Sequence, residues 1–190
     1  MLKNSLARVL EKIISPRLSC GKILELGPGK IWPSLNLVSQ RVALDTIGIG
    51  YTIKEKAQAL KRAGELEIKS RVKYYTEGLL KFPLREQSID GVISFGALHA
   101  WERPQVIFDE VARVLKKGGV FFIGDANHDL NWLHKLLVNY SNTYYKEVYK
   151  KRITIKTIDK ITQVLNTTNL PAFKVERYGP DIWITNCFNS

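Results

Sequence analysis

Cysteine, methionine and histidine are scarce in this sequence of 190 residues, which contains two, one and three of them respectively. Cys20 and Cys187 lie near opposite ends of the chain and form no C-x-x-C or zinc-binding pattern, and the histidines show no metal-ligand spacing. The sequence therefore predicts no metal site. A disulfide between the two cysteines is one alternative, but two free thiols in a reducing cytosol are the simpler interpretation.

Long apolar runs are also absent. No segment approaches the roughly 20 apolar residues that a membrane-spanning helix needs. The N-terminus carries charges at Lys3, Arg8, Glu11 and Lys12, which interrupt the apolar core that a signal peptide requires. Both observations predict a cytoplasmic protein.

Acidic residues are few beside the basic ones. The 29 lysines and arginines outnumber the 18 aspartates and glutamates, and the formal net charge is +11. A nucleic acid, an anionic surface or a phosphorylated metabolite would suit such a charge. However, the basic residues are spread along the chain, with one enrichment over 146–160, and no nucleic-acid-binding motif accompanies them. We therefore prefer a solubilising role for the charge and keep nucleic acid or an anionic surface as the alternative.

Neither repeats nor linkers divide the sequence, so we predict a single domain over 1–190. Apolar residues at three- and four-residue spacing indicate helices, and short apolar runs ended by turn residues indicate strands. The predicted helices lie at 1–20, from about residue 32, and at 52–64, 104–117, 128–149 and 157–165. The predicted strands lie at 22–27, 46–50, 71–78, 88–96, 120–125, 172–179 and 181–188. This alternation predicts an α/β protein with a parallel sheet between helices, closed by an antiparallel hairpin.

Two of these helices carry clear terminal signals. Thr52 and Glu55 have the spacing of a capping box at a helix N-terminus. The helix after Pro104 is expected to hold Lys116 and Lys117 in its last turn, next to two glycines that end it.

The first predicted strand ends in the loop Glu25-Leu26-Gly27-Pro28-Gly29. Glycines allow the backbone to turn sharply and to approach a ligand closely, and the N-terminus of the following helix favours an anionic group. In open parallel sheets, ligands bind beyond the carboxyl ends of the strands. At this point a ligand loop and a purely structural turn are both open interpretations.

Three segments in order resemble the motifs of class I S-adenosylmethionine-dependent methyltransferases. ILELGPG at 23–29 resembles motif I, FPLREQSID at 82–90 resembles the segment before strand four, and DGVISFGALHAWERP at 90–104 with IFDEVARVLKKGG at 107–119 resembles the later motifs. The likeness covers about 23–125 and is greatest to the type 11 group, which includes enzymes of ubiquinone and menaquinone biosynthesis. It implies a Rossmann-like, doubly wound sheet of seven strands in the order 3-2-1-4-5-7-6, with strand 7 antiparallel.

The resemblance also implies the cofactor, S-adenosylmethionine, and the activity, methyl transfer to an unidentified small-molecule acceptor. Glu25 would accept hydrogen bonds from the cofactor's ammonium group, while Lys30 would pair with its carboxylate. The segment 128–152, rich in tyrosine, would cover the substrate. The expected cofactor-binding residues are Glu25, Gly27, Pro28, Gly29, Lys30, Gly50, Tyr51, Glu77, Gly78, Leu79, Phe95, Gly96 and Ala97.

The sequence departs from the family pattern at three of these places. Ile31 replaces the third glycine of motif I, Gly78 replaces an acid near adenine, and Gly50 stands where relatives carry the acid that binds the ribose. Asp45 would supply that acid only if strand two ran over 41–45. If Gly50 holds the position, Gly50→Asp is expected to tighten cofactor binding. Charge-assisted hydrogen bonds are worth roughly 1.5–3 kcal/mol each, so such losses would weaken the site.

These departures keep a second hypothesis open, namely a catalytically degenerate methyltransferase-like domain that acts as a binding or scaffold partner. A nicotinamide-binding Rossmann protein is less favoured, because Trp32 stands where its G-x-G-x-x-G fingerprint requires the third glycine. Methyl transfer from a sulfonium needs mainly proximity and alignment. His99 follows the fourth predicted strand and is the candidate catalytic base, with a packing role as the alternative.

Overall fold

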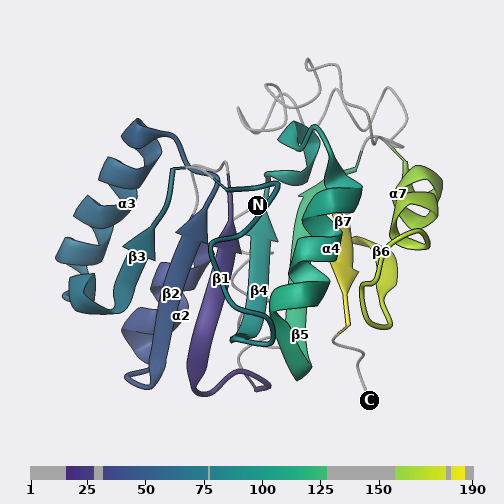
Figure 1. Ribbon diagram of the computed structural model, residues 1–190. Helices are drawn as coiled ribbons and strands as arrows, with labels where there is room; N and C mark the ends of the chain where they lie inside the picture. The colour runs from purple at the N-terminus through teal and green to yellow at the C-terminus, as the bar shows by residue number, and fades with distance from the viewer. Residues whose placement is uncertain (1–15, 28–31, 77, 128–156, 179–180, 187–190) are drawn as a thin grey trace.

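The computed structural model describes residues 16–27, 32–76, 78–127, 157–178 and 181–186, and these form a seven-stranded sheet (Figure 1). The strand order is β3-β2-β1-β4-β5-β7-β6. All neighbouring strands are parallel except that β7 runs antiparallel to both β5 and β6. The predicted order and the antiparallel seventh strand are therefore confirmed. The strands are β1 Gly21–Leu26, β2 Leu44–Ile49, β3 Val72–Tyr74, β4 Ile89–Phe95, β5 Leu115–Ala126, β6 Lys174–Tyr178 and β7 Asp181–Thr185.

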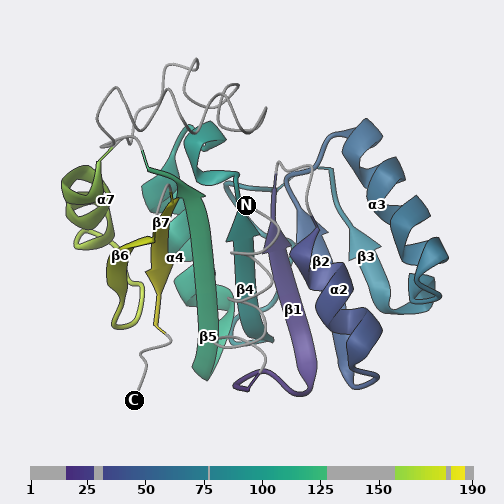
Figure 2. The same cartoon turned by 180° about the vertical axis from the view of Figure 1, so that it is seen from behind.

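Helices cover both faces of this sheet (Figures 1 and 2). Buried side chains of α2 and α3 pack with one face, and those of α4 and α7 pack with the other. Successive residues of one strand point to opposite faces, so Ile23 joins the first core cluster and Leu24 the second. The helices are α2 Pro33–Gln40, α3 Ile53–Glu65, α4 Pro104–Val114 and α7 Ile158–Leu165, with short 3-10 turns η2 Lys69–Arg71 and η3 Leu98–Ala100.

The N-termini of the helices follow the sequence signals. The Thr52 hydroxyl accepts a hydrogen bond from the Glu55 amide, and the Glu55 carboxylate accepts one from the Thr52 amide, so the predicted capping box of α3 is confirmed. Thr157 caps α7 in a similar way by accepting from the Lys160 amide. The predicted helices over 1–20 and 128–149 lie mainly or wholly outside the described residues.

The C-terminus of α4 differs from the prediction. The helix ends at Val114, and Leu115 is already extended and pairs with Ile89 of β4. Lys116 and Lys117 therefore lie in an irregular start of β5, not in the last helical turn. Strand pairing competes with the helix here, and the Lys116 ammonium is held 2.7 Å from a carboxylate oxygen of Asp90 in β4.

A search of the described helices for a stretch long and apolar enough to cross a membrane finds none.

Candidate functional site

Glycines follow three adjacent strands at their carboxyl ends. Gly27 follows β1, Gly50 follows β2 and Gly96 follows β4, and the sheet order places these strands side by side as β2-β1-β4. The chain leaves β1 toward β2 on one side and returns to β4 on the other, so this edge is the point at which the strand order reverses. Ligands of doubly wound sheets bind at such a point. Three strand ends without side chains expose backbone groups to a ligand there.

The turn at Gly27 brings the backbone of two strand ends into close contact. Its amide donates to the carbonyl of Ile49 at 2.8 Å, and a Cβ atom at position 27 would lie 3.0 Å from the Gly50 carbonyl oxygen. A larger residue would push the two strand ends apart. Phe95 and Ala97 lie at the same edge, at the end of β4 and in the turn that follows. The other expected cofactor residues of the first loop, Pro28, Gly29 and Lys30, lie outside the described residues, and so do Ile31 and Glu77.

Strand β2 fixes which residue occupies the ribose-acid position. It covers Leu44–Ile49, so Asp45 is exposed near its amino end and Gly50 directly follows its carboxyl end. The alternative strand over 41–45 is therefore wrong. Gly50 has a φ of +83°, a conformation that side chains rarely adopt, and a Cβ atom there would lie 2.5 Å from Cγ of Leu79. Position 50 thus has neither a carboxylate nor space for one, because the Leu79 side chain fills that space.

Gly78 and Leu79, which we expect near adenine, lie in the loop between β3 and β4. Gly78 has a φ of +100°, and a Cβ atom there would lie 3.2 Å from the Lys81 carbonyl oxygen. The tight turn at Gly78 brings the next residue, Leu79, over Gly50. Apolar side-chain surface thus lies next to the end of β2, where the family pattern has an acid.

Glu25 lies at the end of β1 inside a network of hydrogen bonds, and only 1% of its surface is exposed. One carboxylate oxygen accepts from the amide and hydroxyl of Ser34, and the other accepts from the Tyr51 hydroxyl at 2.8 Å. Thr46 extends the network by donating to the Ser34 hydroxyl at 2.9 Å. The network joins β1, the first turn of α2 and the residues at the end of β2, which surround the glycine loop.

Burial dominates the electrostatics of this carboxylate. It raises the pKa of Glu25 from 4.5 to about 7, although the hydrogen bonds from Ser34 and Tyr51 oppose the rise. Burial and the nearby Glu25 charge also raise the pKa of Tyr51 well above its ordinary value. Tyr51 therefore stays protonated and donates its hydrogen bond at any physiological pH.

Glu25 also replaces a missing helix cap. The N-cap residue of α2, Trp32, makes no side-chain capping hydrogen bond, and Pro33 has no amide hydrogen. The Glu25 carboxylate accepts from the Ser34 amide at 3.1 Å and places an acid at the positive end of the helix. The proposed contact of Glu25 with the cofactor's ammonium stays a prediction. Sequence reasoning missed Ser34 as its partner, and the one available signal was the lack of a capping side chain before Pro33.

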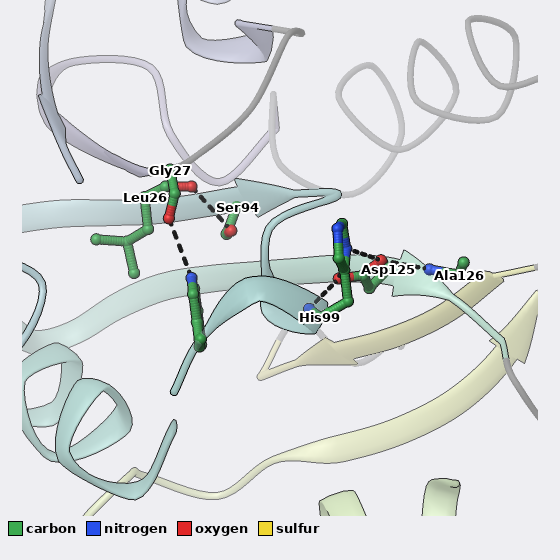
Figure 3. Close-up of polar contacts among 7 residues, drawn as sticks. Leu26, Gly27, Ser94, His99, Asp125 and Ala126 are labelled. Atoms are coloured by element: carbon green, nitrogen blue, oxygen red, sulfur yellow. Dashed lines mark hydrogen bonds and ion pairs between the residues drawn. The ribbon is translucent and has the colours of Figure 1, made fainter. Parts of the chain in front are cut away.

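The turn η3 connects two neighbouring strand ends (Figure 3). On one side, the Trp101 indole nitrogen donates to the Gly27 carbonyl oxygen at 3.0 Å. On the other side, Asp125 at the end of β5 accepts from the His99 amide at 2.7 Å, and the His99 ring nitrogen Nδ1 lies 3.1 and 3.2 Å from its two oxygens. The side chains of His99 and Asp125 are 8% and 5% exposed.

The sequence placed His99 and Asp125 separately on the ligand side of the sheet but did not pair them. Their pairing follows from β4 and β5 being neighbours, since both residues come just beyond or at the carboxyl ends of these strands. A carboxylate that orients an imidazole is a common support for acid–base chemistry. Within the described ranges, no cluster of three or more metal-binding side chains occurs.

Comparison with known proteins agrees with this geometry. The family described as "Methyltransferase domain" matches residues 24–123, and a search of curated protein sequences gave no significant match. Among solved structures, an S-adenosyl-L-methionine-dependent methyltransferase from Methanococcus maripaludis superposes with a TM-score of 0.72 at 20% identity, over 95% of this chain and 82% of that chain.

Two further structures share the fold and contain the cofactor or its product. Geranyl diphosphate C-methyltransferase from Streptomyces coelicolor, with geranyl diphosphate and S-adenosyl-L-homocysteine, has a TM-score of 0.67 at 13% identity, over 97% of this chain and 79% of that chain. Phosphoethanolamine N-methyltransferase 2 from Haemonchus contortus, with S-adenosyl-L-methionine, has a TM-score of 0.69 at 20% identity, over 93% of this chain but only 39% of its own. The chain belongs to the methyltransferase domain family, whose cofactor is S-adenosylmethionine, as the sequence motifs predicted.

Proposed function

We propose that this protein is an S-adenosylmethionine-dependent methyltransferase acting on a small-molecule acceptor. The observation that carries the proposal is the row of Gly27, Gly50 and Gly96 at three adjacent strand ends, where the strand order of the sheet reverses. Their exposed backbone suits the amino-acid and ribose parts of the cofactor, and the apolar side chains of Tyr51 and Leu79 lie beside Gly50. When bound, the cofactor supplies an electrophilic methyl group on a sulfonium.

The small-molecule acceptor is supported by relatives of the same fold. Those described above act, by their names, on phosphoethanolamine and geranyl diphosphate, which are both small. We further propose that one domain spans 1–190 and that the segment 128–152, outside the described residues, covers the acceptor.

A second candidate function is a degenerate methyltransferase-like domain that binds partners without catalysis. It is favoured by one specific observation, the Leu79 side chain in the space of the ribose acid at Gly50. The hydrogen bonds from Ser34 and Tyr51 to both oxygens of Glu25 point the same way. Cofactor binding separates the two candidates.

The test is isothermal titration calorimetry of the full chain with S-adenosylmethionine, S-adenosylhomocysteine and NAD. We expect the first two to bind and NAD not to bind. Gly96→Ala should weaken binding of S-adenosylhomocysteine about tenfold, or about 1.4 kcal/mol, because it adds a side chain at the proposed backbone contact.

The matched control is Gly118→Ala at the opposite edge of the sheet. Gly96 and Gly118 have similar φ angles, +70° and +76°, so alanine strains the backbone to a similar extent at both. A Cβ atom at Gly118 meets nothing within 4 Å, and binding should be unchanged. If neither cofactor form binds to the wild-type protein, the degenerate domain is the correct function.

A further inference from the structure

The η3 turn is held at both ends by side chains from the candidate site. Trp101 fastens it to the Gly27 carbonyl of the cofactor loop, and the Trp101 ring packs edge-to-face on Phe108 of α4 with centroids 5.6 Å apart. His99, two residues earlier, is fastened to Asp125 through both its amide and its ring. The position of the His99 ring is therefore fixed relative to the loop that would hold the cofactor.

The Asp125 carboxylate is itself fixed. One oxygen accepts from the His99 amide and the other from the Ala126 amide, each at 2.7 Å. A carboxylate held by two backbone amides is in its acceptor form, so the nearby Nδ1 of His99 must carry the proton. The basic lone pair of the neutral ring then lies on the other nitrogen, Nε2.

We propose that Asp125 is a positioning residue that holds His99 as the general base, and that the acceptor of this enzyme is a neutral hydroxyl or amine. An acceptor that is already ionised, such as a thiolate or carboxylate, has no proton to lose and no need of such a base. This inference rests on the proposed function, because it assigns the acceptor class of the same reaction.

The proton and electron pairs balance as follows. The acceptor's oxygen or nitrogen forms a bond to the methyl carbon with its own electron pair, and its proton moves to Nε2 of His99. The methyl carbon's bond to sulfur breaks, and that electron pair stays on sulfur. The products are the methylated acceptor, S-adenosylhomocysteine and an imidazolium ring whose positive charge faces Asp125.

Nitrogen-15 NMR of the histidine rings tests the positioning without a known acceptor. The chain has three histidines, so His128→Gln and His134→Gln variants assign the His99 signals. We expect wild-type His99 to show one neutral tautomer, protonated on Nδ1. Asp125→Asn should lose this single-tautomer pattern. Asp109→Asn is the control, because the Asp109 carboxylate also accepts a backbone amide, that of Asn169 at 2.8 Å, and should leave the pattern unchanged.

A second measurement places the ring beside the reacting atoms. With S-adenosylmethionine labelled with carbon-13 on its methyl group, we expect nuclear Overhauser contacts from that methyl to the His99 ring. This uses only the wild-type protein, so an unfolded Asp125 variant does not remove the test. A bound cofactor without these contacts, or a wild-type His99 protonated on Nε2, overturns this inference and leaves the proposed function standing. Absence of cofactor binding in calorimetry overturns both.

Discussion

At the residue scale, Glu25 combines full burial with a chemical group that prefers water. Its pKa of about 7 means that the folded protein holds a proton on Glu25 in a range where the unfolded chain, with a pKa of 4.5, does not. A folded state that binds more protons loses stability as the pH rises. The contribution is absent below about pH 4.5, grows through the interval to pH 7 and is complete above it.

Glu25→Gln tests this linkage. The variant has no ionisable group at position 25, so its free energy of unfolding should fall less between pH 5 and pH 8 than that of the wild type. The difference should approach about 3 kcal/mol, the equivalent of the pKa shift. Urea unfolding at the two pH values measures it, and Glu65→Gln, which removes a carboxylate 48% exposed on α3, serves as the control. Equal pH slopes for Glu25→Gln and the wild type would show that Glu25 ionises normally.

Gly50 and Leu79 form a second residue-scale pair. The structure replaces our sequence-based expectation that Gly50→Asp tightens cofactor binding, because the new side chain has a strained φ and meets Leu79. Gly50→Asp should instead destabilise the fold by about 1–3 kcal/mol. Gly118→Asp, with a similar φ and open space, measures the backbone share of that loss.

The Leu79→Ala variant then completes a double-mutant cycle in urea unfolding. Because Leu79→Ala removes the colliding atoms, Gly50→Asp/Leu79→Ala should lose less stability than the two single losses added together. Simple additivity would mean that Leu79 moves aside at no cost.

At the element scale, the helix ends show which sequence signals are decisive. The capping box of α3 uses residues three positions apart, so the sequence alone identified it. The end of α4 depends on whether Leu115 continues the helix or pairs with Ile89, a residue 26 positions earlier. Local propensity for Lys116 and Lys117 could not decide that competition, and the prediction failed there.

Thr52→Ala measures the contribution of the capping box. The variant loses the hydroxyl that accepts from the Glu55 amide, so the free energy of unfolding should fall by about 1 kcal/mol. Thr52→Ser keeps an accepting hydroxyl and should stay within a few tenths of wild type in the same urea titration. Equal losses for both variants would assign the effect to the methyl group of threonine instead.

At the scale of the whole molecule, the alternation of helices and strands with the methyltransferase motifs predicted the sheet order. The glycine-lined edge followed, because Gly27 and Gly96 stand directly after their strands. The contacts within the site were not predictable in the same way. Glu25 with Ser34, and His99 with Asp125, are pairs in which a side chain at a strand end chooses among several neighbours, and packing of the whole chain decides that choice.

The sheet order also has a consequence for the two outer strands. In the part of the chain that the structure describes, β3 and β6 are the edges. β3 has only three residues, with exposed Lys73 at its centre, and β6 presents an exposed ion pair between Lys174 and Glu176. Short or charged edge strands resist pairing with a strand from another molecule. A sheet that is apolar through its interior is thus protected at both borders from aggregation by strand addition.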